Sequence, residues 1–476
     1  MFYHAYEAYM VLAFPKDDIR PISGSGHNSY GGLSVTLIDS LDTLAVMGDK
    51  EEFNKAVNLV KDISLHNDVN ISVFETNIRV IGGLISAHLL QHEMNPNNLP
   101  NGWPCKGPLL EKAQQVADIL LKSFDSPSGI PYGSINLRNG VPNYSVESTC
   151  IACAGTFILE FAALSRLLGD DKYEKAALKS FRKLWEARSD LNLFPRYINI
   201  TNGNATTEES SVGAESDSFF EYLLKGAVLT GSKELNDMFT TALDAINKLI
   251  RNNELWHAYV SLRTGNILKH HFSSLEAFWP GLLALHGDID AAVNMFKAHF
   301  ELWKKFGFLP DAYDFKQNTL LSSELAYPLR PEFAESALYL FQATNNPFYL
   351  DVGKQIISSI KHSAKTFFGY AHIHRVTDHA VDDLMESFFL AETTKYLYLL
   401  FDPNNFIFNS QSMTTIQGTM GKKCLINSGF YIFTTEGHYI DAGVLECCSS
   451  VFNSDSQYRP SNKAFCNYSI YDQFYM

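Results

Sequence analysis

A repeated boundary between helical stretches constrains the fold of this chain more than any other feature. An apolar stretch ends at glycine, asparagine or aspartate, polar residues follow, and an amphipathic stretch begins. Glycine and asparagine suit the end of a helix, and short polar side chains cap the start of the next one. The boundary occurs at six positions: Gly48, Gly169, Gly231, Gly287, Asn345 and Asp402.

The boundaries follow one another about every 60 residues, except that the first interval is about twice as long. Residues 72–123 fill that interval with two further helical stretches around a Pro/Gly/Asn-rich break. We therefore expect seven helical hairpins of roughly 59 residues each, much longer than tetratricopeptide units. Strand-like alternation is short, with candidates at 130–137 and 429–435.

Helical pairs at a fixed period form either an open superhelix or a closed ring. The first stretch of each pair is apolar nearly all round, as in residues 151–168, and such a helix is buried. The second stretch is amphipathic, as in 173–185. Buried inner helices inside amphipathic outer ones favour an all-α barrel of the α/α type, formed as one large domain.

Acidic residues interrupt the apolar stretches at a shared depth. Six of them lie about 10 residues before a boundary: Asp39, Glu160, Glu221, Glu276, Glu335 and Glu392. Asp217 and Glu332 lie higher in their own stretches, and Glu75 joins them from the unit without a boundary. Pro331, directly before Glu332, suits the first turn of a helix.

Buried carboxylates are rare unless they are paired or bind something. A single acid fits a structural pair with arginine or a backbone amide. A ring of acids at one depth instead indicates a pit for a cation, a polyhydroxyl ligand, or both. Calcium takes hard oxygen ligands, and glycoside hydrolysis needs an acid and a base on either side of the bond.

Other chemistries have weaker support. The chain has no HExxH motif, no EF-hand loop and no GxSxG elbow, and His372 with His374 is an isolated pair. Cys150 and Cys153 form a CxxC motif without the strand context of thioredoxin-like sites, so a structural or partner-linked role for Cys150 is favoured. The net charge of −14 argues against a nucleic-acid surface. No apolar stretch is expected to span a membrane.

Five glycosylation sequons permit a secretory location: Asn70, Asn143, Asn199, Asn204 and Asn467. Seven cysteines, an odd number, leave at least one thiol unpaired or intermolecular. The first residues resemble a helix of the fold, so we expect a signal peptide to be absent from this chain.

Six longer motifs resemble the class I α-mannosidases, glycoside hydrolase family 47, and within them the ER degradation-enhancing group. They are VTLIDSLDTLAVMGD, SVFETNIRVIGGLISAH, GAESDSFFEYLLKG, YPLRPEFAES, MESFFLAETTKYLYLLFD and FTTEGH. The resemblance covers about residues 1–440 and implies an (α/α)7 barrel there, with 441–476 as a tail of unknown structure. It implies inverting hydrolysis of α1,2-linked mannose on N-glycans, with a calcium ion at the barrel floor.

The resemblance also assigns roles. Glu75 is the expected general acid, Glu332 the general base and Asp217 the third catalytic carboxylate. Thr435 is expected to bind Ca²⁺ through its hydroxyl and carbonyl groups. The remaining assignments concern contacts with the sugar, an acid or the waters of calcium: Arg79, Arg330, Glu335, Glu392 and Glu436.

This chain departs from the family pattern at three places. Glu215 stands in GAESDS where a glycine-rich run is usual, and Gly24 stands where a cysteine is expected. FTTEGHYI differs from the usual residues around the calcium threonine. These departures question turnover and leave the predicted fold unchanged.

Two functions follow from the resemblance. The first is a mannosidase in the ER lumen that trims high-mannose glycans on misfolded glycoproteins, which links it to ER-associated degradation and the unfolded protein response. The alternative is a mannose-binding lectin or client receptor on the same barrel. A thiol oxidoreductase partner, acting through Cys150 or Cys105, is compatible with both.

Overall fold

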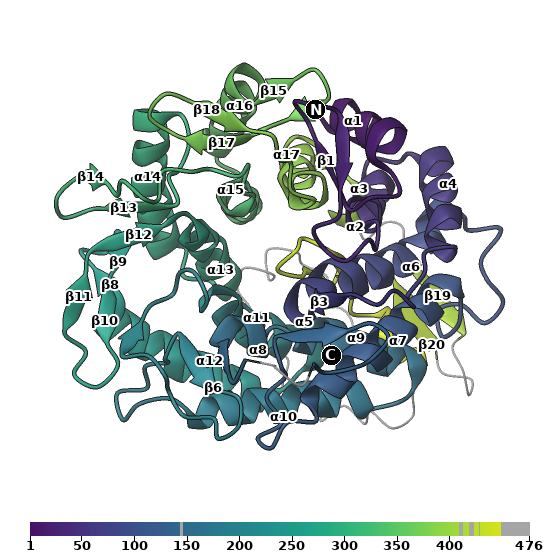
Figure 1. Ribbon diagram of the computed structural model, residues 1–476, viewed down its shortest axis with the longest axis horizontal. Helices are drawn as coiled ribbons and strands as arrows, with labels where there is room; N and C mark the ends of the chain where they lie inside the picture. The colour runs from purple at the N-terminus through teal and green to yellow at the C-terminus, as the bar shows by residue number, and fades with distance from the viewer. Residues whose placement is uncertain (143–145, 409–412, 418–422, 428, 449–476) are drawn as a thin grey trace.

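Helices in two concentric layers surround a central axis in the computed structural model (Figure 1). The structure describes residues 1–142, 146–408, 413–417, 423–427 and 429–448. The inner layer consists of α2 (Val35–Asp39), α3 (Leu41–Val46), α5 (Val73–Glu75), η2 (Thr76–Ile81), α6 (Gly82–Met94), α8 (Ile151–Gly155), α9 (Ile158–Leu168), α11 (Asp217–Thr230), η5 (Ser274–Phe278), α13 (Trp279–His286), α15 (Glu332–Thr344), η6 (Phe389–Thr393) and α17 (Thr394–Phe401).

Amphipathic helices form the outer layer and turn one face toward the inner helices. They are α1 (Phe2–Ala8), η1 (Tyr9–Ala13), α4 (Lys50–Lys61), α7 (Pro108–Leu121), η3 (Lys122–Phe124), α10 (Lys172–Glu186), α12 (Lys233–Ala245), η4 (Ile246–Ile250), α14 (Ile289–Phe306) and α16 (Phe348–Ser363). The predicted α/α arrangement is therefore present.

Five of the six predicted boundaries adopt the left-handed conformation that ends a helix. The φ angles are 77° at Gly48, 72° at Gly169, 70° at Gly231, 100° at Gly287 and 52° at Asn345. Asp402 differs, with a φ angle of −121° after α17. The glycine and asparagine positions were thus predictable from helix-end chemistry.

The last inner helix has no outer partner after it in the described sequence, which corrects the expectation of a hairpin at Asp402. The described residues that follow form the 3-10 turns η7 (Phe406–Phe408) and η10 (Val444–Glu446) and strand pairs. The N-terminal helix α1 packs beside η6 instead. The ring is therefore closed by the two ends of the helical region, because α3 also contacts η6.

Short antiparallel strand pairs connect the helices. They are β1 (Asp18–Arg20) with β2 (Ser25–His27), β3 (Asn70–Ser72) with β4 (Ser134–Asn136), β5 (Ser148–Cys150) with β6 (Tyr197–Asn199), β7 (Glu209–Ser210) with β10 (Tyr259–Ser261) and β11 (Ile267–Lys269), β8 (Arg251–Asn252) with β9 (Trp256–His257), β12 (His271–Ser273) with β13 (Ala312–Asp314) and β14 (Thr319–Leu320), β15 (Lys365–Thr366) with β16 (Gly369–Tyr370), β17 (His372–Arg375) with β18 (Ala380–Asp382), β19 (Thr414–Gln417) with β20 (Lys423–Ile426), and β21 (Tyr431–Phe433) with β22 (Tyr439–Asp441). The predicted strands at 130–137 and 429–435 correspond to β4 and β21.

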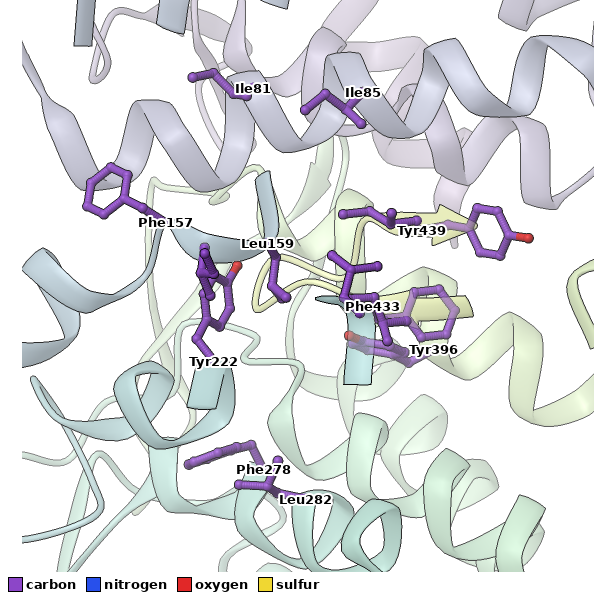
Figure 2. Packing of buried hydrophobic residues seen from close by; sticks show 14 of the residues in the cluster. Ile81, Ile85, Phe157, Leu159, Tyr222, Phe278, Leu282, Tyr396, Phe433 and Tyr439 are labelled. Carbon is purple, nitrogen blue, oxygen red and sulfur yellow. The ribbon is translucent and has the colours of Figure 1, made fainter. Parts of the chain in front are cut away.

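The β21–β22 hairpin packs against the inner helices (Figure 2). Phe433 and Tyr439 are buried among residues of the inner layer, and the Phe433 ring meets the Tyr396 ring edge-on at 5.7 Å. Ile85 on α6 and Tyr222 on α11 belong to the same apolar cluster. This packing fixes the turn between the two strands, residues 434–438, inside the ring.

We expected no apolar stretch long enough to span a membrane, but one helical stretch meets this criterion by its length and composition. Residues 151–168 form 18 residues with a mean hydropathy of 1.6. In the fold 83% of this stretch is buried, as expected for an inner helix of the barrel.

Six cysteines are paired in the described part of the chain. The disulfides are Cys105–Cys448, Cys150–Cys153 and Cys424–Cys447. Neither Cys105 nor Cys150 is therefore a free thiol here. Cys466, the sequons at Asn143 and Asn467, and residues 449–476 of the expected tail lie outside the described residues.

Candidate functional site

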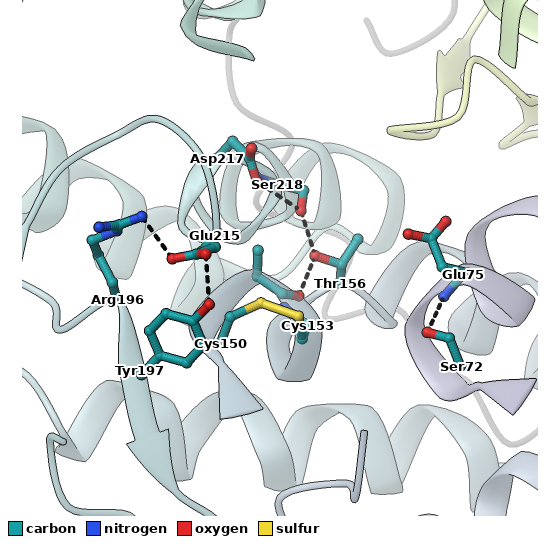
Figure 3. The surroundings of a disulfide bond; sticks show 11 residues. Ser72, Glu75, Cys150, Cys153, Thr156, Arg196, Tyr197, Glu215, Asp217 and Ser218 are labelled. Carbon is teal, nitrogen blue, oxygen red and sulfur yellow. Dashed lines mark hydrogen bonds and ion pairs between the residues drawn. A yellow bond between two sulfur atoms is a disulfide. The ribbon is translucent and has the colours of Figure 1, made fainter. Parts of the chain in front are cut away.

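The three predicted catalytic carboxylates each lie in the first turn of an inner helix. Glu75 belongs to α5, Asp217 begins α11 and Glu332 begins α15. The Glu75 amide donates a hydrogen bond to the Ser72 hydroxyl at 3.2 Å, which caps its helix (Figure 3). The fold thus gives each carboxylate the same place in a helical unit. Pro331 is the residue before α15, one position earlier than the predicted helical position.

The pKa values of Glu332 and Asp217 are both raised by burial and by neighbouring charges. Burial raises the pKa of Glu332 to about 8; Arg330 opposes this rise, whereas the charges of Glu335 and Asp217 add to it. Burial likewise raises the pKa of Asp217 to about 7, with a further contribution from Glu221. Both residues are partly exposed, and the charge of Asp217 is one of those that raise the pKa of Glu332.

Arg79 holds the predicted acid in place. Its Nε donates to Glu75 Oε2 at 2.7 Å, and its guanidinium also pairs with Glu436. The residue is only 6% exposed. Of the two roles expected for Arg79, orienting an acid is the one that these contacts support.

Arg330 has a more open position. Its Nη2 lies 2.9 Å from Asp311 Oδ1, and its side chain is 22% exposed. Burial lowers the pKa of Arg330, but the charges of Glu332 and Asp311 outweigh this effect and raise it. A guanidinium that is paired on one side and partly exposed remains able to donate hydrogen bonds to a ligand.

Thr435 lies in the turn between β21 and β22. It is partly exposed, and its amide donates to the Tyr222 hydroxyl at 3.3 Å. The His438 imidazole fixes the turn, because its two nitrogens lie 3.1 Å from Asp39 and 3.1 Å from Asp42. The turn is thus attached to the first inner helices of the chain.

The deeper acids are crowded around few cations. Burial raises the pKa of Glu392 well above its usual value, and the charges of Glu436, Glu332 and Glu335 raise it further. Lys225 contacts both Glu221 and Glu335, the latter at 3.4 Å. The buried carboxylates therefore carry more potential negative charge than the nearby cations offset.

These residues offer the hard oxygen donors that a divalent cation such as calcium prefers. Thr435 offers a hydroxyl and a carbonyl oxygen, and Glu335, Glu392 and Glu436 offer buried carboxylates. Within the described ranges, no three acidic, histidine or cysteine side chains converge as direct ligands.

All six acids predicted at one depth are buried, but their roles differ. Glu160 accepts hydrogen bonds from the Tyr222 hydroxyl at 2.6 Å and from Asn77 at 3.1 Å. Glu276 accepts from the Ser273 amide at 3.3 Å and caps η5. These two acids have structural hydrogen-bond partners, so they fit the structural alternative for a buried carboxylate and not a ligand site.

Sequence reasoning missed the buried cations of the site. Lys225 and Lys395 are 1% and 0% exposed, and both lie on inner helices. Their signal is visible in the sequence, since each lysine follows an acid by three or four residues in an apolar stretch: Glu221 and Glu392. That spacing puts acid and lysine on one helix face.

Glu215 adopts a backbone conformation that favours glycine. Its φ angle is 74°, and its side chain contacts Arg196 at 2.7 Å and the Tyr197 hydroxyl at 2.5 Å. The extra charge that the sequence introduces beside Asp217 is therefore compensated by Arg196 (Figure 3).

A barrel of paired helices with carboxylates at the starts of its inner helices is an arrangement that a glycoside hydrolase of the α/α type would need. The sequence profile of glycosyl hydrolase family 47 matches residues 1–442. The chain belongs to this family and is a hydrolase of the mannosidase type.

Named relatives agree. The chain is 46% identical to the human "ER degradation-enhancing alpha-mannosidase-like protein 2" over 449 residues, covering 94% of this chain and 77% of the relative. It is 41% identical to "Alpha-mannosidase I MNS4" of Arabidopsis thaliana, covering 92% and 68%. The segments GWPCKGPLL and GHNSYGGLSVTLID predicted the similarity to the second member of the ER group.

A solved structure supports the fold. The "alpha-1,2-mannosidase from Trichoderma reesei" superposes with a TM-score of 0.81 at 26% identity, covering 93% of this chain and 97% of that chain. The similarity therefore extends over the whole barrel.

Proposed function

We propose that this protein is an inverting α1,2-mannosidase that trims high-mannose N-glycans on misfolded glycoproteins in the ER lumen. The observation that carries the proposal is geometric, because Glu75, Asp217 and Glu332 each lie in the first turn of an inner helix of the same ring. The name of the Trichoderma structure supports the linkage, and the names of the ER relatives support a role in degradation. Because the similarity to the Trichoderma structure extends over the whole barrel, it includes the region of the candidate site.

Each carboxylate has a proposed role. Glu75, held by Arg79, donates a proton to the leaving oxygen, and Glu332 takes a proton from the attacking water. Asp217 is the third catalytic carboxylate. Arg330, partly exposed beside Glu332, binds the sugar together with Glu335 and Glu392.

Calcium belongs to this proposal as the cofactor. Thr435 would hold it through its hydroxyl and carbonyl oxygens, and Glu335, Glu392 and Glu436 would hold its waters. When bound, calcium supplies positive charge that polarises sugar hydroxyls and water. The role of Glu332 is to accept the proton that the attacking water loses.

The proposal includes the architecture and the partners. We expect seven repeats in an (α/α)7 barrel over residues 1–440, followed by a C-terminal tail at 441–476. The described part of this tail is attached to the barrel through β22 and the Cys105–Cys448 disulfide. A thiol oxidoreductase is a proposed partner, and it would have to open a disulfide to react with Cys105 or Cys150.

Glycan profiling tests the function. The purified protein is incubated with a denatured high-mannose glycoprotein, with calcium or with a chelator, and the glycan masses are followed. Loss of hexose units only with calcium is the expected result. Calcium-dependent binding to mannose without any trimming would contradict the enzyme and favour the lectin alternative.

Calcium should stabilise the fold more at pH 8 than at pH 5. Burial raises the folded-state pKa of Asp217 to about 7 and of Glu332 to about 8, so without a cation these groups lose stabilising free energy as the pH rises through those values. Calcium binds the ionised site, and at 100 times its Kd it adds about 2.7 kcal/mol.

Thermal unfolding of metal-free protein, with and without added calcium at both pH values, measures this difference. Thr435→Val should reduce the calcium increment, whereas Thr240→Val, on the exposed face of α12, should keep it. An increment of equal size at both pH values would contradict the coupling between calcium and these carboxylates.

A further inference from the structure

The Cys150–Cys153 disulfide lies against the segment that carries Asp217 (Figure 3). Cys150 ends β5, and Cys153 lies in α8. Cys150 is buried, whereas Cys153 is partly exposed, and the chain just before β5 is exposed at Val146. Of the two cysteines, Cys153 is therefore the one with surface accessible to a reagent from solution.

The first connection to the site runs through the backbone. Ala152, which the disulfide ring encloses, donates its N–H to the Glu215 carbonyl at 2.9 Å. Cys150 pairs with Tyr197 across β5 and β6, and the Tyr197 hydroxyl donates to the Glu215 carboxylate at 2.5 Å. The strained residue two positions before Asp217 is thus held from both sides of the disulfide loop.

The second connection runs through hydroxyl groups. The Ala152 carbonyl accepts a hydrogen bond from Thr156 Oγ1 at 2.7 Å, and Thr156 Oγ1 lies 2.8 Å from Ser218 Oγ. The Ser218 amide donates to Asp217 Oδ1 at 2.8 Å. Each connection includes a hydrogen bond of Ala152, so a movement of this residue reaches the Glu215 backbone and, through Thr156 and Ser218, the Asp217 carboxylate.

We propose that Cys150–Cys153 is a reversible thiol–disulfide site whose reduction displaces Asp217 and lowers mannosidase activity, a step that rests on the proposed function. The co-reactant is a protein dithiol. Its thiolate attacks the Cys153 sulfur, the bond between Cys150 and Cys153 breaks, and Cys150 leaves as a thiolate that takes up a proton. The second thiol of the partner then resolves the mixed disulfide, releases Cys153 as a thiol and leaves the partner oxidised by two electrons.

Reduction changes the geometry around Ala152. Two sulfur atoms without a covalent bond separate to at least van der Waals contact, which releases the constraint on the turn at the start of α8. Both connections to the Asp217 segment then loosen. Because a displacement of about 1 Å in a catalytic group can cost up to about 100-fold in rate, we expect a loss of about tenfold.

The test uses the full chain and dithiothreitol as the reductant. Differential alkylation with peptide mass spectrometry quantifies each disulfide, hydrogen exchange is followed in residues 213–218, and mannose release is measured in parallel. We expect exchange in this segment to rise and mannose release to fall about tenfold as Cys153 becomes alkylated. Cys150→Ala/Cys153→Ala should show both changes without reductant, and Cys105→Ala/Cys448→Ala should respond to the reductant as the parent protein does.

The two readouts separate the proposals. Unchanged exchange in 213–218 after full alkylation of Cys150 and Cys153 would overturn the coupling, as would an undiminished response in the Cys150→Ala/Cys153→Ala variant. Increased exchange with unchanged mannose release would overturn the control of activity. A chain that releases no mannose in any state refutes the proposed function, and exchange still decides the coupling; if the double variant does not fold, the titration of the parent protein decides it.

Discussion

Replacing Glu332 with glutamine is expected to lower the rate of mannose release by about 10²- to 10⁴-fold, the usual contribution of a general base. The side chain is at the start of α15, and burial raises its pKa to about 8. Glutamine keeps the size and shape of the side chain, but it replaces one acceptor oxygen with an NH2 donor and cannot take a proton from water. The effect should therefore fall on kcat, with KM changed by less than about threefold.

The stability of Glu332→Gln should be equal to that of the parent protein or higher, although its activity falls. An ionised carboxylate in a buried site costs free energy, and glutamine removes that cost. The melting temperature of metal-free Glu332→Gln should thus equal or exceed that of the parent protein at pH 8. Unfolding curves recorded beside the glycan profiles separate a lost catalytic group from a lost fold.

Glu174→Gln provides a matched control. Glu174 is 8% exposed and pairs with Arg166 at 2.9 Å, between the outer helix α10 and the inner helix α9. The same substitution there should lower stability and leave kcat unchanged. A Glu332→Gln protein that retains more than about a tenth of the parent rate would rule out Glu332 as the general base.

Much of the inner layer could be predicted because its rules are local. Helix ends at Gly169, Gly231, Gly287 and Asn345 follow from residues that tolerate positive φ angles. The buried depth of the acids follows from counting along apolar helices. Both predictions need only the geometry of one helix and no knowledge of its neighbours.

The parts that escaped prediction depend on contacts distant in sequence. α1 packs beside η6 at the other end of the chain, so no spacing near Asp402 could reveal it. The β21–β22 hairpin brings Thr435 to Tyr222 only through tertiary packing. The pairing of Cys105 with Cys448 joins residues 343 positions apart, which a cysteine count cannot determine.

Lys395→Met is expected to reduce the free energy of unfolding by about 3–5 kcal/mol, because it removes the lysine partner of the buried Asp42 carboxylate. Lys395 Nζ lies 2.8 Å from Asp42 Oδ1, and both side chains are 0% exposed. Asp42 also accepts from the Ser86 hydroxyl at 3.0 Å and contacts His438 at 3.1 Å. The pair therefore joins inner helices α3, α6 and α17 with the turn that carries Thr435.

The pH dependence of stability shows whether the ionised Asp42 carboxylate is responsible for the loss. Burial raises the pKa of Asp42, but Lys395 and His438 outweigh it and lower the pKa to about 2. A depressed folded-state pKa contributes stability above the unfolded value of about 4, and this contribution is lost as the pH falls toward 2. Between pH 5 and pH 3 the parent protein should thus lose more stability than Lys395→Met does. The difference in free energy of unfolding between the two proteins should therefore decrease.

Chemical denaturation of both proteins, together with two further variants, measures the effect. Lys354→Met removes an exposed pair with Asp351 at 2.9 Å and should change stability by less than about 1 kcal/mol. Asp42→Leu added to Lys395→Met should recover part of the loss, because no unpaired charge then remains. If Lys395→Met costs no more than Lys354→Met, the buried pair does not hold the C-terminal turn in the barrel. The attachment of the Thr435 turn must then come from its other contacts, which are the His438 contacts with Asp39 and Asp42 and the packing of Phe433 and Tyr439.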